Sequence, residues 1–233
     1  MDPSRLAIVI PAYNEEATIQ GVVGNVTHLG QVFVVDDAST DATAVLAEEA
    51  GAIVVRQARN QGYDAALEAG FKAASLSDAS AVITMDADGQ HRISDVEKVA
   101  QQLVEGQELV LGVRDSKARL AERIFAAVLY ARWHIRDPLS GLKGYSMRLY
   151  CKEGFFDQRR STGTELMVRA LRRGVKAREI PIEIIPRLSE NPRFGGIFTA
   201  NKRILSSLWR VLPLLFGLRS RSLESWRDPR GTR

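Results

Sequence analysis

The sequence has almost no cysteine and no long hydrophobic run. Cys151 is the only cysteine among 233 residues, so no disulfide can form within the chain, which suits a reducing compartment. The longest uncharged stretch of the apolar C-terminal region is 211–218, far short of the roughly twenty residues of a membrane-spanning helix. Residues 1–20 lack the basic and apolar regions of a cleaved signal peptide. We therefore expect a cytoplasmic protein without a disulfide scaffold or a spanning helix.

Positive charge is concentrated near the C-terminal end. The formal net charge is +4, and residues 187–233 hold ten Lys or Arg against three Asp or Glu, so the rest of the chain is slightly acidic. A basic segment of this kind suits phosphates, nucleic acid or an anionic membrane surface. With 45% hydrophobic and 26% charged residues, the composition is that of a globular domain and excludes a disordered chain.

Short apolar runs alternate with helical patterns along the sequence. The runs at 6–10 and 32–35 are rich in β-branched residues and lack polar alternation, as is typical of strands buried on both faces. Repeated strand–helix–strand units predict an α/β fold with a mostly parallel sheet. We expect strands at 6–10, 32–35, 52–55, 81–84, 109–113 and 176–185. We expect helices at 14–28, 41–50, 62–75, 93–104, 118–134, 164–173 and 198–218. Pro213 should kink or split the last helix, and 137–145 should be turn-rich.

An acidic pair follows the predicted strand 81–84. Asp86 and Asp88 stand two residues apart, and in a parallel sheet the ligand site lies where the strands end. Two such carboxylates can reach one Mg²⁺ or Mn²⁺ ion, which completes its shell with substrate phosphates and water. His91 lies beside the pair, where it either contacts a phosphate or packs. The competing interpretation is a solvated acidic turn that caps the helix 93–104.

Polar clusters also follow the first two predicted strands. Tyr13 offers a ring face for a base, and Glu15 offers a carboxylate acceptor. Asp36 or Asp37 can accept a hydrogen bond from a base or a ribose hydroxyl. The competing interpretation is that side chains in these clusters cap the following helices, through Asn14, Ser39 or Asp41.

Four segments in order carry a family resemblance. The segments are PAYNEE at 11–16, VVDDASTD at 34–41, NQGYDAA at 60–66 and MDADGQH at 85–91. They closely resemble the motifs of the family 2 inverting glycosyltransferases, which have a GT-A fold, and look most like the polyprenyl-phosphate (dolichyl-phosphate) sugar synthases. The resemblance implies metal-dependent transfer of a sugar from a GDP- or UDP-sugar to a lipid phosphate or a glycan. We expect a GT-A catalytic domain at 1–186, followed by a basic lid loop and an amphipathic helical tail at 187–233.

The resemblance also implies roles for individual positions on the donor side. It assigns nucleotide and diphosphate binding to Pro11, Tyr13, Glu15, Asp36, Asp37, Asp86, Ala87, Asp88, Gln90, Arg187 and Arg193. It assigns metal binding to Asp86, Asp88 and Gln90. Asp64 departs from the family, which usually has Gly or Lys there. Because a carboxylate would repel a diphosphate, Asp64 instead suits the first turn of the following helix.

On the acceptor side, the resemblance implies that Arg114, Arg123 and Ser140 hold a lipid phosphate. A guanidinium fork donates two parallel hydrogen bonds to a phosphate. A lipid phosphate needs no strong general base, whereas a sugar hydroxyl does, and Asp137 and Glu165 are then the candidates. The competing interpretations are surface ion pairs for the two arginines and a turn-forming role for Asp137.

The C-terminal region 202–221 mixes large apolar residues with Lys and Arg. This pattern is typical of a helix lying in an anionic membrane interface, and it predicts a peripheral protein at the inner face of the membrane. The alternative is an amphipathic helix docked on the sheet or in a dimer interface. The sequence leaves open whether the chain forms a homo-oligomer.

Three other functional classes compete with the glycosyltransferase. A nucleotidyltransferase should have a Gly-rich basic loop after the first strand, where this chain has YNEE at 13–16. A dehydrogenase should have GxGxxG there, which is absent. A nucleic-acid-binding protein would use the basic tail but leave the acidic motifs unexplained, so nucleic acid is not an expected partner.

Overall fold

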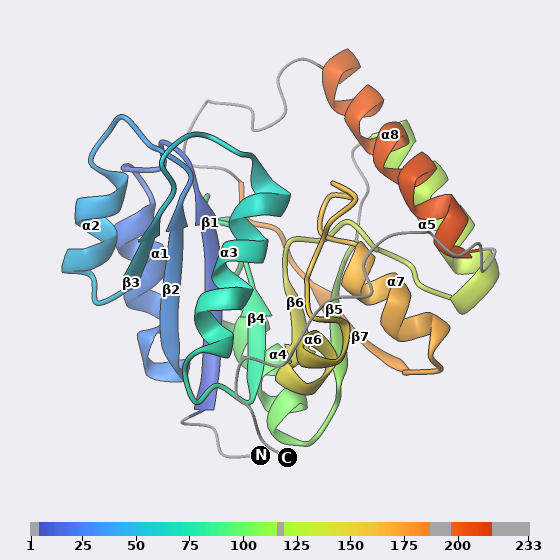
Figure 1. Ribbon diagram of the computed structural model, residues 1–233, viewed down its shortest axis with the longest axis horizontal. Coiled ribbons are helices and arrows are strands. Elements are labelled where there is room, and N and C mark those ends of the chain that lie inside the picture. The colour runs from blue at the N-terminus through green and yellow to red at the C-terminus, as the bar shows by residue number, and fades with distance from the viewer. Residues whose placement is uncertain (1–4, 116–118, 187–196, 216–233) are drawn as a thin grey trace.

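The computed structural model describes residues 5–115, 119–186 and 197–215. Its strands form one seven-stranded sheet in the order β3-β2-β1-β4-β6-β5-β7 (Figure 1). Only β6 is antiparallel to its neighbours; the other adjacent pairs are parallel, which confirms the predicted fold class. The strands are β1 (Leu6–Ala12), β2 (Gln31–Asp36), β3 (Ile53–Arg56), β4 (Ala81–Thr84), β5 (Leu109–Arg114), β6 (Lys143–Ser146) and β7 (Ala177–Ile182).

Helices cover both faces of this sheet (Figure 1). Successive residues of a strand point to opposite faces, so Val9 of β1 packs in the same core as α3, while Ile8 and Ile10 pack with α1 and α4. The core beside α3 also includes residues of α5, α6, α7 and α8. The helices are α1 (Ile19–Val26), the 3₁₀ helix η2 (Thr27–Leu29), α2 (Thr43–Glu49), α3 (Tyr63–Ser75), α4 (Ile93–Val104), α5 (Leu120–Trp133), α6 (Met147–Glu153), α7 (Glu165–Arg172) and α8 (Ile197–Leu215).

The helix predicted over 14–28 is shorter in the structure. It begins only at Ile19, because Asn14 adopts a left-handed backbone conformation (φ 54°) and a turn follows it. The Asn14 side chain does not cap this helix: its Oδ1 accepts the Thr40 N–H at 2.9 Å. The predicted cap is therefore wrong, and Asn14 instead joins the loops that follow β1 and β2.

The second half contains an unpredicted strand and an unpredicted helix. The turn-rich interpretation of 137–145 is wrong at its end, where Lys143 begins β6 between β4 and β5. Ser146 then caps α6 by accepting the Leu149 N–H at 3.4 Å. Unlike the β-branched run at 81–84, the segment KGYS at 143–146 has no β-branched residue and no apolar run that would mark a strand in the sequence. Its pairing is set by its two neighbours.

Helix α8 belongs to the main hydrophobic core. It runs side by side with α5 (Figure 1), and its residues Ile204, Leu208, Val211 and Leu214 are buried in the core cluster. Pro213 does not split it, so the predicted split is wrong; the proline lies in the last described turn, where it costs few helical hydrogen bonds. None of the helices that the structure describes combines the length and the apolar character needed to cross a membrane.

Candidate functional site

The acidic pair lies directly after β4 at the carboxyl edge of the sheet. Asp88 is buried (3% exposed), and its Oδ1 accepts the Gln90 N–H at 3.2 Å. Asp86 retains some exposure, and the Tyr63 hydroxyl lies 3.4 Å from its Oδ1. The backbone of Gly141 packs so closely against Asp86 that a Cβ at position 141 would overlap the carboxylate. The loop after α5 thus closes one side of the acidic motif.

The residues that follow the acidic pair are hydrogen-bonded to the segment just after β7. Gln90 donates from Nε2 to the Ile185 carbonyl at 3.2 Å and accepts the Ile185 N–H at its own carbonyl. The His91 ring is buried with Nε2 3.8 Å from Asp86 Oδ2. Neither ring nitrogen of His91 has a hydrogen-bond partner among the described residues. These contacts hold the segment after the acidic pair against residues 184–185. Arg187 and Arg193, the predicted lid residues, lie outside the described residues.

The donor set suits a divalent cation that shares its ligands with a substrate. Within the described part of the chain, no three or more His, Cys, Asp and Glu side chains are arranged to hold a metal alone. Mg²⁺ commonly takes one or two carboxylates and completes its shell with phosphates and water. Asp86 and Asp88 supply two carboxylates beside the unpartnered, buried nitrogens of His91. These residues fit a cation bound together with a diphosphate.

The loops after β1 and β2 interlock. The Asn14 N–H donates to Ser39 Oγ at 2.9 Å, and the Glu15 N–H donates to Thr43 Oγ1 at 2.8 Å. Asp41 Oδ1 accepts the N–H of Thr43, the first residue of α2, at 3.0 Å. The N-cap position of α2 is nevertheless Ala42, without a side-chain cap bond, so the N-cap predicted at Ser39 or Asp41 is wrong. Together these bonds fix the polar clusters as one rigid surface.

Tyr13 stands on that surface with 48% of its area exposed, so its ring is available to stack on a base. Glu15 is buried, with the Thr18 hydroxyl 3.4 Å from its Oε2. The same hydroxyl donates to the Ala87 carbonyl at 2.7 Å, which ties the first loop to the acidic motif. Pro11 is buried within β1. Pro11 and Ala87 therefore contribute backbone shape, whereas Tyr13 presents a side chain.

Asp36 and Asp37 act differently although they are adjacent. Both oxygens of Asp37 accept backbone N–H groups, Oδ1 from Gln61 and Oδ2 from Gly62, each at 2.7 Å. Asp36 uses Oδ1 for the Ser39 N–H at 3.0 Å, and its Oδ2 has no hydrogen-bond partner among the described residues. Asp37 thus shapes the 57–62 loop, and Asp36 keeps an oxygen for a hydroxyl or base.

On the acceptor side, Asp137 and Arg114 form a buried ion pair. Arg114 donates from Nε and Nη2 to Asp137 at 2.7 and 3.0 Å and from its backbone N–H at 3.1 Å. Glu122 accepts a further bond from Nη2 at 3.1 Å. Burial disfavours the charged guanidinium, but the hydrogen bonds and charges of Asp137 and Glu122 outweigh it and raise the pKa of Arg114. Arg114 therefore stays protonated, and its guanidinium is held in one position by hydrogen bonds to Asp137.

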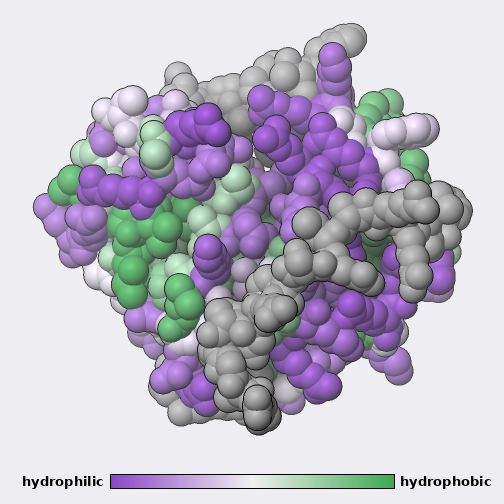
Figure 2. All heavy atoms as spheres, viewed as in Figure 1, coloured by the Kyte–Doolittle hydropathy of each residue, from purple (hydrophilic) through white to green (hydrophobic). Residues whose placement is uncertain are grey.

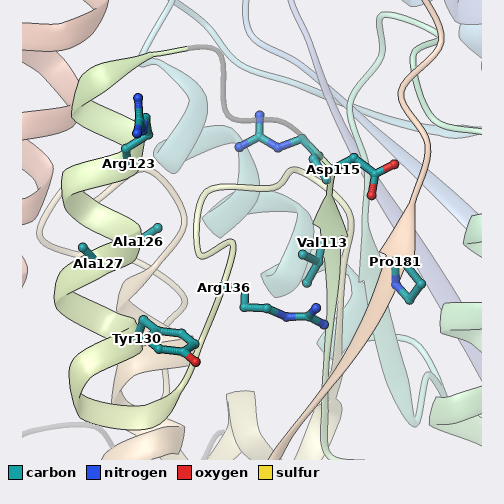
Figure 3. Close-up of a pocket in the computed structure, with 9 residues that line it drawn as sticks. Val113, Asp115, Arg123, Ala126, Ala127, Tyr130, Arg136 and Pro181 are labelled. Atoms are coloured by element: carbon teal, nitrogen blue, oxygen red, sulfur yellow. The ribbon is translucent and has the colours of Figure 1, made fainter.

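Arg114 and Arg123 line one cavity of about 580 Å³ between β5, β7 and α5. In Figure 3, Arg123 and Tyr130 extend from α5, while Arg136 lies across the cavity near Pro181. Arg136 escaped the sequence analysis; its Nε donates to Glu179 at 2.7 Å. No motif marks it, because only the fold brings the residues after α5 beside β7.

The other two acceptor-side candidates are deeply buried. Ser140 is 2% exposed, and its Oγ has no hydrogen-bond partner among the described residues. Glu165 accepts hydrogen bonds from the side chains of Arg159 and Arg169 at 3.3 and 2.8 Å. It also accepts the Gln158 N–H at 2.9 Å. Glu165 is therefore bound within a network of arginine and backbone donors.

Lys143 is a buried cation that the sequence analysis did not single out as a separate site residue. Burial lowers the pKa of its ammonium to about 8, although Asp137, Asp157 and Asp86 favour the charged form. Its Nζ donates to the Gly163 carbonyl at 3.0 Å, and Asp64 Oδ1 accepts the Gly163 N–H at 2.6 Å. Asp64 thus lies in the first turn of α3, as expected, but it also holds the loop before α7.

Comparison with known proteins agrees with this geometry. Residues 7–158 match the family described as glycosyl transferase family 2. An uncharacterised protein of Methanocaldococcus jannaschii is 33% identical over 202 residues, covering 79% of this chain and 83% of the relative. A UDP-N-acetylglucosamine–dolichyl-phosphate N-acetylglucosaminyltransferase of Methanococcus voltae is 27% identical over 212 residues, covering 76% and 84%.

A solved structure shares the fold. Glucosyl-3-phosphoglycerate synthase from Mycobacterium tuberculosis, in complex with Mn²⁺ and UDP-glucose, superimposes with a TM-score of 0.72 at 21% identity. The match covers 94% of this chain and 81% of that one. At this identity the likeness concerns the arrangement of the sheet and helices alone.

Proposed function

Because the chain belongs to glycosyl transferase family 2 and is a glycosyltransferase, we propose that it moves a sugar from a nucleotide diphosphate donor to a lipid phosphate, with inversion at the anomeric carbon. The observation that carries this proposal is the cavity in which Arg114, Arg123 and Arg136 gather beside the buried carboxylate of Asp137. Three arginines around one opening suit a phosphate far better than a neutral sugar.

The donor is assigned to the edge formed by the loops after β1, β2 and β4. Tyr13 stacks on the base, Asp36 accepts from the base or ribose, and the rigid loops around Glu15 orient the nucleotide. A divalent cation held by Asp86 and Asp88, with Gln90 at its flank, would offset the negative charge of the leaving diphosphate. The relative from Methanococcus voltae is named for a UDP-sugar, which supports UDP before GDP as the first donor to test.

The state of the carboxylates favours a phosphate acceptor over a hydroxyl. A sugar hydroxyl needs a base to take its proton, but Asp137 is bound by Arg114 and Glu165 by Arg159 and Arg169. A lipid phosphate is already anionic near neutral pH. Its oxygen attacks the anomeric carbon, the bond from that carbon to the diphosphate oxygen breaks, and no proton has to be removed.

The outer face of α8 supports docking on an anionic membrane. Trp209 is 75% exposed and Leu205 lies one turn before it; the exposed Lys202 and Arg203 border this face on the side toward α3, where Arg210 donates to the Arg160 carbonyl. Exposed aromatic and aliphatic groups beside cations suit an interfacial helix. The opposite face of α8 packs against the hydrophobic core of the domain. The helix can therefore be part of the core and still present its outer face to a membrane. The remainder of the expected interface, 216–221, lies outside the described residues.

A transfer assay tests the proposed function. The full chain is incubated with labelled UDP- or GDP-sugars, Mn²⁺ or Mg²⁺, and either a short-chain polyprenyl phosphate or a free sugar as acceptor. The proposal expects an acid-labile glycolipid only with the polyprenyl phosphate. Transfer to the free sugar alone would assign the enzyme to a glycan acceptor instead.

A further inference from the structure

A second cavity lies between α3 and α8, apart from the cavity lined by Arg114, Arg123 and Arg136; it borders the acidic motif at Tyr63, whose hydroxyl lies 3.4 Å from Asp86 Oδ1. It has a volume of about 1050 Å³ and is walled by α3, α8, the 57–62 loop and the turn at 157–162. We call it the α3–α8 cleft. Hydrophilic residues cover the molecular surface between these two helices (Figure 2). Its volume slightly exceeds the roughly 300–1000 Å³ of pockets that hold whole small molecules, so it is large enough for such a ligand.

Cations converge on this cleft from three separate elements. Lys72 comes from α3, Arg160 from the turn, and Lys202 and Arg203 from α8. None of these four side chains forms an ion pair with a described residue, in contrast to Arg56 at the rim, which pairs with Glu48. All four are exposed, so water and salt screen their mutual repulsion, and they stay available to an anion that enters the cleft.

The carboxylates that line the cleft are already engaged by backbone groups. Asp64 accepts the Gly163 N–H at 2.6 Å, and Glu68 accepts the Phe156 N–H at 2.6 Å. Asp157 accepts N–H groups of Ser161 and Arg159 at 3.1 and 3.0 Å. Burial further raises the pKa of Asp64 to about 6. The backbone hydrogen bonds favour the ionised form of these carboxylates, so near neutral pH the three acids offset part of the positive charge at the walls, which more cations than carboxylates line.

The turn that carries Arg160 is held in a costly conformation. Arg160 and Thr162 have positive φ angles of 55° and 57°, which L residues adopt only when the surroundings enforce them. Ser207 and Arg210 of α8 both donate to the Arg160 carbonyl, at 3.4 and 3.1 Å. Thr162 is hydrogen-bonded to Ser207 at 2.7 Å. The fold thus fixes the turn against α8 and keeps Arg160 at the cleft wall.

We propose that the α3–α8 cleft binds a phosphate ester at a site separate from the sugar donor and the acceptor. Lys72, Arg160, Lys202 and Arg203 supply the charge, and the Ser206 hydroxyl supplies a hydrogen-bond donor. The ester is either a soluble phosphorylated metabolite or the headgroup of a lipid, because both present the same group. The 57–62 loop, which Asp37 holds on its other side, is the shared wall between this cleft and the donor loops.

Calorimetric titration of the full chain tests this site. The probes are inorganic phosphate, glycerol 3-phosphate and monomeric dihexanoyl-phosphatidylglycerol, each with and without saturating UDP and Mn²⁺. The test variant is Lys72→Gln/Lys202→Gln, which removes one cation from α3 and one from α8. The matched control is Arg148→Gln/Lys152→Gln, which removes two exposed cations of α6 that do not line the cleft.

The proposal expects the cleft variant to bind a phosphate ester at least tenfold more weakly and the control variant to change less than twofold. Binding of glycerol 3-phosphate identifies a soluble ligand, and binding of the short-chain lipid alone identifies a headgroup. Equal affinities of both variants, or displacement of the ester by UDP, would overturn the separate site. UDP binding and sugar transfer are measured in parallel, so failure of the cleft is distinguishable from failure of the proposed enzyme activity.

Discussion

The carboxylate of Asp137 receives three hydrogen bonds from Arg114, two from the guanidinium and one from the backbone N–H. The carboxylate is 1% exposed, so the pair is shielded from water and its geometry is fixed. This arrangement explains why an acidic residue stands in a region that we assign to an anionic acceptor. Asp137 orients the cation and does not itself face the substrate as a free base.

Asp137→Asn should weaken the hold on Arg114 and impair use of the lipid phosphate. We expect kcat/KM for the acceptor to fall about 30-fold, equivalent to about 2 kcal/mol, because asparagine lacks the negative charge and the second acceptor oxygen that hold Arg114. The KM for the donor should stay within twofold. Steady-state kinetics with each substrate varied in turn provide the measurement. Glu48→Gln, which breaks an exposed pair with Arg56, is the control, and an unchanged acceptor constant in Asp137→Asn would contradict the assignment.

Gly141→Ala should disrupt the acidic motif without touching its sequence. A methyl group at position 141 overlaps the Asp86 carboxylate, which must shift to make room. We expect cation-dependent UDP binding to weaken at least tenfold in calorimetric titrations with Mn²⁺. Gly24→Ala in α1, where a Cβ meets no atom within 4 Å, is the matched control and should bind normally. Normal binding by both variants would show that Asp86 is not needed for the cation.

Asp64→Asn should change how stability depends on pH. Burial and the neighbouring Asp157 raise the pKa of Asp64 from 3.8 to about 6, so between these values the folded chain binds the proton more tightly than the unfolded chain. The free energy of unfolding should therefore fall as pH rises from 3.8 to 6, by up to about 3 kcal/mol. Asparagine can still accept the Gly163 N–H without that penalty.

Urea unfolding at pH 4.5 and pH 7 measures this effect. The wild-type chain should lose more stability than Asp64→Asn between the two pH values. Asp78→Asn, at an exposed loop position, serves as the control and should follow the wild type. A variant whose pH dependence matches the wild type would show that Asp64 keeps an ordinary pKa.

Leu205→Ser/Trp209→Ser should reduce membrane binding while sparing the fold. Both side chains are exposed on α8, at 43% and 75%, so their loss removes apolar area from the outer face and leaves the core packing intact. We expect binding to phosphatidylglycerol vesicles to weaken about tenfold or more in sedimentation assays. Leu76→Ser replaces a leucine that is 78% exposed elsewhere and should have no effect. Equal vesicle binding by all three proteins would exclude α8 as the membrane contact.

The local sequence was sufficient for elements with a strong pattern. Strand 81–84 and helix 93–104 were predicted with the bounds that the structure shows, because a β-branched run and a clear helical period each specify one backbone state. Helix 14–28 was predicted too long, since the reciprocal hydrogen bonds of Asn14 with 39–40 override its local preference.

The motifs also predicted which segments meet, but not what each side chain does there. Asp36 and Asp37 were equivalent candidates in the sequence, and only the fold binds both oxygens of Asp37 to the 61–62 backbone. Arg136 and Lys143 gave no separate signal, because their significance comes from neighbours brought in by β7 and by the loop before α7.

By itself, the sequence determined the α/β architecture and the edge at which the acidic clusters gather. Apolar runs, helical patterns and their succession along the chain are local properties, and they can be recognised without knowing the tertiary contacts. The tertiary structure alone decided which charges are paired and which face a cavity. Asp137 and Glu165 form ion pairs with arginines, whereas Lys72 and Lys202 line one cleft. Electrostatic roles of this kind depend on distances between segments far apart in the chain, and those distances are set only when the hydrophobic core packs.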